Sequence, residues 1–167
     1  MLSWFTRPSK KEQLTSLFSK YVPKELVNSA GSTGTSELNQ LFEGSVEFVF
    51  ALVQGSTPNE TGQMLGTVAT IAERGGWMVQ ALLCNLVVIV HGTLPSPKQP
   101  IGRLALTDQL FAALAHGVKI VHGSEVACFG AMGGTSRVTY GVLLPSFTEV
   151  LLALNALQFG KAGEFHG

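Results

Sequence analysis

The side chains that bind metals and transfer protons are few in this chain of 167 residues. Asp108 is its one aspartate, and ten glutamates supply the other acidic side chains. A site that binds a divalent cation between two aspartates of this chain is therefore excluded. His91, His116 and His122 show no spacing typical of a metal site. A serine–histidine–aspartate triad would have to use Asp108, which falls within an expected helix, so we assign neither chemistry.

A glycine-rich segment, Gly130 to Ser136, is the other stretch that could do chemistry. Backbone amides in such a segment can bind phosphate. This one lacks the lysine–serine ending of a P-loop and leads into an expected strand, Arg137 to Leu143, rather than into a helix. We therefore interpret it as a hairpin loop.

Composition restricts the classes of function. Hydrophobic residues make up 46% of the chain and the mean hydropathy is +0.30, which predicts one globular domain with a substantial core. The formal net charge is zero, so there is no electrostatic case for binding nucleic acid. A frayed N-terminus is favoured over membrane contact through Met1 to Lys11, because the apolar part is too short. We predict no cofactor.

The two cysteines indicate the compartment. Cys84 and Cys128 are isolated in apolar surroundings, which favours buried thiols over a disulfide or a metal site. Thiols of this kind are typical of a reducing compartment, so we expect a cytoplasmic location.

One central strand must position whatever site exists. Val46 to Val53 is apolar at both alternating sets of positions, which predicts a strand covered on both faces. Thr57, Pro58 and Glu60 then form a strong helix start, with a cap, a proline at the first position and an acidic residue at the third. Gly75–Gly76 ends that helix. Its expected buried stripe consists of Met64, Val68, Ile71 and Ala72.

Further elements follow from hydrophobic periodicity and turn residues. We expect a strand hairpin with its turn at Cys84–Asn85 and a second one with its turn at Gly123–Ser124. The first pairs Trp77 to Leu83 with Leu86 to His91, and the second pairs Val118 to His122 with Glu125 to Gly130. A helix between Leu104 and Leu114 separates the hairpins, and another is expected over Ser146 to Phe159.

This order of elements predicts an α+β fold with a ferredoxin-like antiparallel sheet and its helices on one face. Residues 1–36 are expected to form an N-terminal helical lead-in, with short helices over about 10–21 and from Pro23. The main domain is expected over 37–160, and 161–167 is expected to be a tail.

Two segments carry a resemblance to a known family. Phe50-Ala51-Leu52-Val53-Gln54-Gly55-Ser56-Thr57 resembles the first strand and turn of class III nucleotidyl cyclase catalytic domains, and Arg137 to Val142 resembles a later strand. The resemblance covers about residues 10 to 158. It implies the cyclase-homology fold and a relation to enzymes that make cyclic nucleotides from nucleoside triphosphates.

The resemblance also implies where functional residues should lie. The two metal-binding aspartates of the family fall on Leu52 and on Cys84 or Asn85, and its base-reading lysine falls on Gln80 or Ala81. A second base-reading residue falls on Pro145, and the asparagine and arginine that stabilise the transition state fall on Thr148 and Leu152. Because none of these positions keeps its charge, we predict that the chain is not an enzyme.

The expected function is accordingly a catalytically inactive, dimeric interaction or regulatory module. Two alternatives remain open, namely a nucleotide-binding sensor without turnover and a residual cyclase with relocated ligands. The helix expected from Ser146 to Phe159 is apolar all round, which indicates burial on more than one side. The family dimerises near this helix, so we expect a homodimer, or a heterodimer with a cyclase-like domain. The expected interface residues are Phe147, Leu151, Leu152 and Leu157.

Overall fold

The computed structural model describes residues 41–93, 99–134 and 137–166, with side chains for all of these except 131–139. The predicted N-terminal helices and the segment Met1 to Lys11, for which the sequence favours a frayed terminus over membrane contact, lie outside the described residues. Two compact units are distinguished, Leu41–Gly130 with Gly141–Gly167, and Met1–Gln40 with Ala131–Tyr140. The first unit holds the features discussed below.

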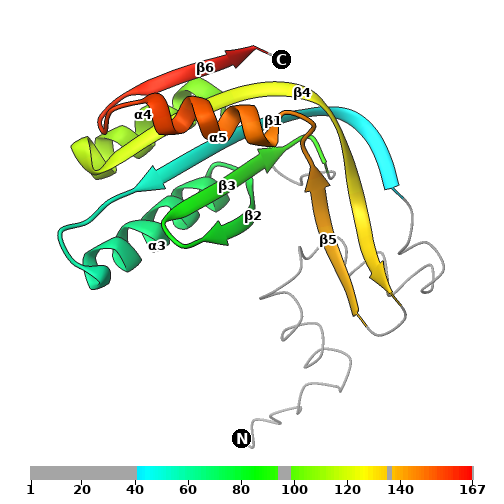
Figure 1. Cartoon of the computed structure of the whole chain (residues 1–167), viewed down its shortest axis with the longest axis horizontal. Coiled ribbons are helices and arrows are strands. Elements are labelled where there is room, and N and C mark those ends of the chain that lie inside the picture. Colours follow the sequence, from blue (N-terminus) through cyan, green and yellow to red (C-terminus); the bar gives the residue numbers. More distant parts are fainter. Residues whose placement is uncertain (1–40, 94–98, 135–136, 167) are drawn as a thin grey trace, which may run out of the picture. The chain divides into compact units, whose positions relative to one another are not determined.

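The fold is an α+β arrangement of a six-stranded sheet and three α-helices within the described residues. The strands are β1 (Leu41–Val53), β2 (Met78–Leu83), β3 (Leu86–His91), β4 (Val118–Gly134), β5 (Arg137–Leu143) and β6 (Ala162–His166). The helices are α3 (Pro58–Arg74), α4 (Arg103–Leu114) and α5 (Phe147–Ala156), with a 3-10 turn, η2, at Ala115–Gly117. The strand order is β2-β3-β1-β4-β5, and β6 pairs with β4 (Figure 1).

Strand β1 lies in the middle of the sheet, as predicted. It pairs antiparallel with β3 on one side and with β4 on the other, and its residues from Val46 to Ala51 are buried except for Glu47. Alternate side chains enter two separate cores. Val49, Ala51 and Val53 face one cluster, whereas Val46, Phe48 and Phe50 face the other.

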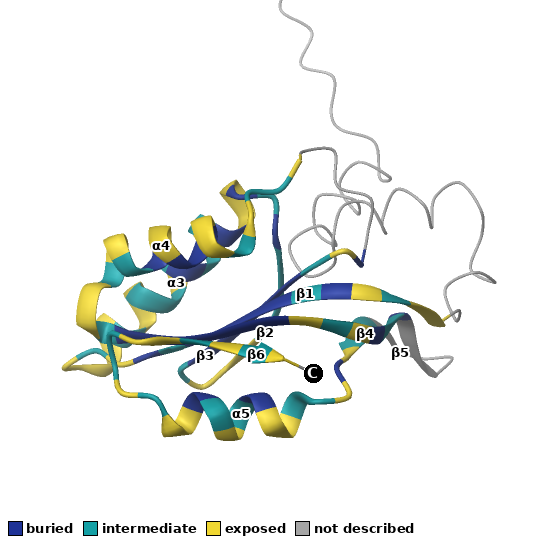
Figure 2. Ribbon diagram, turned by 90° about the horizontal axis from the view of Figure 1, so that it is seen from above, coloured by how far each residue is buried: buried dark blue, intermediate teal, exposed yellow. Residues whose placement is uncertain are grey.

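Helices cover both faces of the sheet, which corrects the expectation that they lie on one. Helices α3 and α4 pack on the first core cluster, and α5 packs on the second (Figure 2). Both alternating sets of β1 side chains are apolar, so each face needs its own cover. The strand pattern already required two covered faces, and α5 supplies the second.

Helix α3 begins and ends as the sequence predicts. The Thr57 side chain accepts a hydrogen bond from the Glu60 amide, Pro58 occupies the first helical position, and Gly75 is the C-cap. Val68 and Ala72 are buried, with Met64 and Ile71 packed beside them. Helix α4 covers the range expected from Leu104 to Leu114, and Leu104 itself is 64% exposed.

The predicted turn at Gly123–Ser124 is wrong, because β4 runs unbroken from Val118 to Gly134. Strand β1 pairs with β4 continuously from Val53↔Val118 to Leu41↔Gly130, so nothing interrupts the ladder. Glycine is needed at position 123 because there is no room for a side chain, and not because the chain turns there. A Cβ atom at this position would lie 2.7 Å from both the Phe48 ring and the Phe165 carbonyl oxygen. The expected loop from Gly130 is likewise strand up to Gly134.

Two further boundaries differ from expectation. Helix α5 spans Phe147–Ala156, so it is shorter than the predicted Ser146 to Phe159. Residues 162–166, expected to be part of a tail, form β6, which is parallel to β4 in a sheet whose other described ladders are antiparallel. None of the described helices is long and apolar enough to cross a membrane.

Candidate functional site

The two positions implied for metal-binding carboxylates lie close together in the structure. Leu52 pairs with Leu86, the residue after the β2–β3 turn. The Asn85 side chain donates a hydrogen bond of 3.1 Å to the Val53 carbonyl oxygen, and the Val53 amide donates one of 2.9 Å to the Asn85 carbonyl. The end of β1 and the hairpin turn therefore form one rigid corner.

The side chains at this corner are not metal ligands. Leu52 is half-buried against the second core cluster, and the Asn85 amide is engaged with the backbone of β1. Cys84 is exposed at the turn with a φ of 56°, which corrects the prediction that it is buried. Among the residues that the structure describes, no group of three histidine, cysteine, aspartate or glutamate side chains could hold a metal ion.

A buried lysine stands beside Leu52 in the sheet. Lys119 of β4 pairs with Leu52 and is only 7% exposed. Its ammonium group donates to the carbonyl oxygens of Asn155 and Leu157 at 3.3 and 3.2 Å, and lies 5.2 Å from the centre of the Phe159 ring. The C-terminal end of a helix carries partial negative charge, so this position stabilises a cation.

A carboxylate lies at the other end of the same helix. The Ser146 hydroxyl donates a hydrogen bond to the Glu125 carboxylate just before α5 begins, where partial positive charge favours an anion. Lys119 and Glu125 are six residues apart on β4, so they point to the same face of the sheet. Strand β4 thus holds each end of α5 with a charge of the favourable sign.

Neither residue was predicted from the sequence to belong to a site. The available signal was one lysine and one glutamate six residues apart on the same face of a largely apolar strand. The predicted turn at Gly123–Ser124 concealed it by dividing that strand between Lys119 and Glu125.

The loop before α3 is the other feature of the site. Its amide groups are already bonded by side chains of the helix that follows. The Gly55 amide donates to the Thr61 hydroxyl at 3.1 Å, and the Ser56 amide donates to the Glu60 carboxylate at 2.7 Å. A phosphate at this helix start would have to displace the Glu60 carboxylate.

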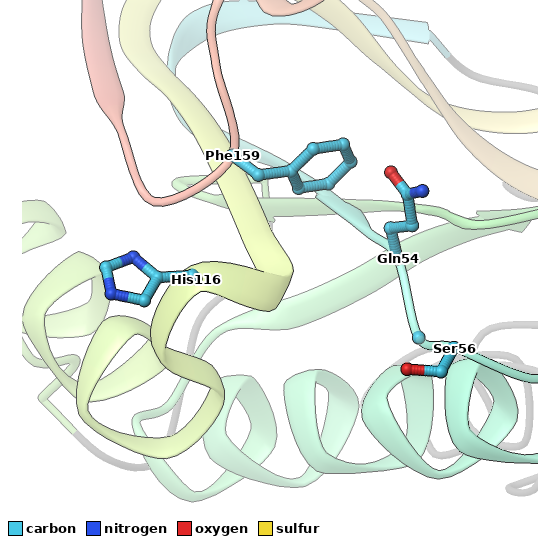
Figure 3. Close-up of a pocket in the computed structure, with 5 residues that line it drawn as sticks. Gln54, Ser56, His116 and Phe159 are labelled. Carbon is cyan, nitrogen blue, oxygen red and sulfur yellow. The ribbon is translucent and has the colours of Figure 1, made fainter.

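A pocket of about 290 Å³ adjoins this loop and is lined by Gln54, Gly55, Ser56, His116 and Phe159. Figure 3 shows Gln54 and Phe159 near one another, with the His116 imidazole pointing away from them. That imidazole lies against the backbone at Gly160, where a Cβ atom would come within 2.8 Å of the His116 Nδ1. Among the described residues, no carboxylate and no lysine or arginine lines the pocket.

The remaining implied positions are spread over β2 and the start of α5. Gln80 lies at the register shift between Val79 and Ala81, where β2 bulges away from β3. Pro145 and Thr148 are exposed.

The four expected interface residues behave differently from one another. Leu152 is 64% exposed on α5. Phe147 packs edge-on against Phe50 with ring centres 5.3 Å apart, and Leu151 and Leu157 pack on the second core cluster. We expected Leu157 to need cover from a partner, but it follows the end of α5 and turns back onto its own core. Leu152 is the one residue of this set that the described part of the chain leaves uncovered.

The sequence and the structure were compared with those of known proteins. No family model and no curated protein matches the sequence. Solved structures do match. A bacterial light-regulated adenylyl cyclase aligns with a TM-score of 0.66 at 10% identity, over 86% of this chain and 48% of that protein.

Two further solved structures give the same result. The guanylyl cyclase Cya2 aligns with a TM-score of 0.55 at 13% identity, over 74% of this chain and 75% of its own length. The adenylyl cyclase CyaB from P. aeruginosa aligns with a TM-score of 0.55 at 11% identity, over 76% and 79%.

These matches correct one prediction and confirm another. The prediction of a non-enzyme is contradicted, because the structural neighbours are all adenylyl or guanylyl cyclases. The resemblance seen in the sequence is confirmed at the level of the fold. The described chain has the fold of the class III adenylyl and guanylyl cyclase catalytic domains.

Proposed function

We propose that this chain is one subunit of a cyclase-fold dimer, in which it acts as an interaction or regulatory module. The observation that carries the proposal is Leu152. It is 64% exposed at the middle of a helix whose other large apolar side chains pack on their own sheet. Leu104 on α4 is equally exposed, but α5 is the helix near which the resemblance implies dimerisation, so we infer that a partner surface buries Leu152.

The partner that fits is a second cyclase-fold domain, either another copy of this chain or a related subunit. One structural neighbour is described as a dimeric guanylyl cyclase domain of a RhoGC fusion protein, which supports dimers as an assembly of this fold. A symmetric dimer contains two copies of Leu152, so the burial of this side chain contributes twice to the stability of the dimer.

The second candidate is nucleotidyl cyclase activity of the assembled dimer, which the fold comparison favours. Leu52 offers no metal ligand, so the carboxylates for such a reaction would come from the partner subunit or from a glutamate of this chain. The Glu60 carboxylate accepts a hydrogen bond from the Ser56 amide of the loop next to the pocket. Glu60→Gln tests its part in any turnover.

The magnitude of the expected interface effect follows from burial. Covering a leucine side chain contributes about 1.5–3 kcal/mol, so two copies contribute about 3–6 kcal/mol. Since about 1.4 kcal/mol is a tenfold change, Leu152→Asp should raise the dimer dissociation constant by about 10²- to 10⁴-fold. Its circular dichroism should stay unchanged, because residue 152 leaves the core intact.

Leu104→Asp is the matched control. Leu104 is also 64% exposed on a helix, but it lies on α4, across the sheet from α5. Sedimentation of the full chain between about 1 and 100 μM should show a dimer for the wild type and Leu104→Asp, and a monomer for Leu152→Asp. A wild-type monomer at the highest concentration, alone and mixed with extract from its source, refutes the dimer.

The two candidates are separated by assay of the same three proteins with ATP or GTP and Mg²⁺ or Mn²⁺. Cyclic nucleotide from the wild type and Leu104→Asp, with loss in Leu152→Asp, establishes the dimer as a cyclase. Dimers without product leave the interaction module as the function of this chain by itself.

A further inference from the structure

A buried histidine lies on β4 where this strand pairs with β6. His122 is 5% exposed, and its Nδ1 atom has no hydrogen-bond partner among the described residues. It pairs in register with Val49 of β1 and with Glu164 of β6. The interaction face and the pocket described above make no use of it.

Charged groups approach His122 from two elements. Arg103, the first residue of α4, forms an ion pair of 2.6 Å with Glu164 of β6. The Arg103 Nε atom is also buried and has no hydrogen-bond partner among the described residues. From β1 the residue in register is the apolar Val49, and from β6 it is Glu164, with His166 4.0 Å from the Glu164 carboxylate.

Strand β6 is held by few contacts. It has one described strand neighbour, the segment of β4 from Ile120 to Ser124, and its side chains alternate between exposed and half-buried. Strand β6 also has the ion pair with Arg103 and the packing of Phe165 on the second core cluster, with its ring centre 6.2 Å from that of Phe48. Gly163 lies close to the Leu157 side chain. A short edge strand of this kind has low local stability.

We propose that His122 is a proton sensor that controls the docking of β6 onto β4. A proton on His122 places a second positive charge beside Arg103 in a buried site. The cost of burying this charge and its repulsion from Arg103 outweigh its attraction to Glu164, so protonation favours the state in which His122 is hydrated and β6 is undocked.

The direction of the pH effect follows from the environment of the imidazole. Burial lowers the pKa of His122 below 6.5 and the neighbouring Arg103 lowers it further, while Glu164 partly opposes both. Undocking of β6 removes Glu164 but leaves Arg103 in place on α4. It also hydrates the imidazole, which relieves the largest cause of the lowered pKa, so His122 binds a proton more readily in the undocked state. Docking is therefore complete above pH 6.5 and weakens as the pH falls from 6.5 towards the lowered value.

Release of β6 would change the pocket as well. The chain leading into β6 is fixed by hydrogen bonds from the Gly160 amide to the Val118 carbonyl, 2.7 Å, and from the Ile120 amide to the Lys161 carbonyl, 3.1 Å. Phe159 comes directly before Gly160, lines the pocket and lies beside the Lys119 ammonium. Undocking would therefore release Phe159, which forms one wall of the pocket. It would also remove the contact of the Phe159 ring with the Lys119 ammonium, which is bonded to the C-terminal end of α5.

Amide hydrogen exchange in the full chain tests the proposal. Protection factors of β6 residues 162–166, corrected for intrinsic exchange, are compared with those of β3 at pH 7.5 and pH 5.5. We expect β6 protection to fall by up to about tenfold per pH unit in the sensitive range, the limit for one proton, while β3 protection stays constant.

Three variants test whether His122 itself is the group whose protonation controls β6. His122→Gln should abolish the pH response, and Glu164→Gln should lower β6 protection already at pH 7.5. His166→Gln is the matched control, since this histidine is near the same carboxylate but exposed, and it should respond like the wild type.

The wild type also gives a test that needs no mutation. The imidazole resonance of His122 and the β6 amide shifts should titrate with one midpoint below 6.5. Equal β6 protection at both pH values, a response that survives in His122→Gln, or different midpoints for the imidazole and β6 would each overturn the proposal.

Discussion

Replacing Lys119 by methionine removes the cation at the C-terminal end of α5 while keeping a side chain of similar length. The ammonium group donates to the Asn155 and Leu157 carbonyl oxygens, and it is almost completely buried. Lys119→Met leaves both carbonyls without this donor and places an apolar group against them.

The expected cost follows from these contacts. A hydrogen bond from a charged group contributes about 1.5–3 kcal/mol, and a cation at a helix end contributes about 0.3–1 kcal/mol. The two bonds at 3.2 and 3.3 Å are long, and methionine recovers some apolar burial, so we expect a net loss of about 2–4 kcal/mol. For a chain of this size that corresponds to a melting temperature lower by about 4–16 °C.

Urea unfolding and thermal melting of the full chain measure this effect. Lys161→Met is the matched control because Lys161 is exposed, and it should change the free energy of unfolding by less than about 0.5 kcal/mol. Lys119→Arg should retain part of the stability. A loss below about 1 kcal/mol in Lys119→Met, or equal losses in Lys119→Met and Lys161→Met, would refute the account of how α5 is held.

Two further changes test the sheet and the corner near the pocket. Gly123→Ala should destabilise the protein by about 1–3 kcal/mol in urea unfolding, because its Cβ would overlap the Phe48 ring and the Phe165 carbonyl, whereas Gly62→Ala on the open side of α3 should be neutral or stabilising. A neutral Gly123→Ala would show that the crowding relaxes without cost. Asn85→Ala should cost about 0.5–1.5 kcal/mol by removing the hydrogen bond to Val53, again measured by urea unfolding, and an unchanged midpoint would mean that this bond contributes nothing.

Much of the fold could be predicted because its signals are local. The cap, proline and glutamate at Thr57 to Glu60 specify a helix start through hydrogen bonds within four residues, and the structure shows those bonds. The turn at Cys84–Asn85 separates two apolar runs that pair with each other. In both cases the partners are close in sequence, so residue type and spacing are enough.

Predictions failed where the local structure depends on a contact with a residue far away in the sequence. Gly123 and Ser124 have the composition of a tight turn, yet Gly123 is required by the Phe48 ring and by a backbone 42 residues later, and the strand continues. Leu157 appeared to be a surface residue of a long helix, but α5 ends at Ala156 and Leu157 turns onto the core.

The candidate site divides in the same way. The central strand, the helix start beside it and the lack of carboxylates at Leu52 and the hairpin turn could be read from residue identity and local hydrogen bonding. Tertiary contacts were needed to show that Lys119 and Glu125 hold opposite ends of α5. They were also needed to show that Glu60 bonds the Ser56 amide and that His122 lies beside an ion pair from α4 and β6. Burial and charge pairing depend on which elements meet in space, and the local pattern of residues does not contain that information.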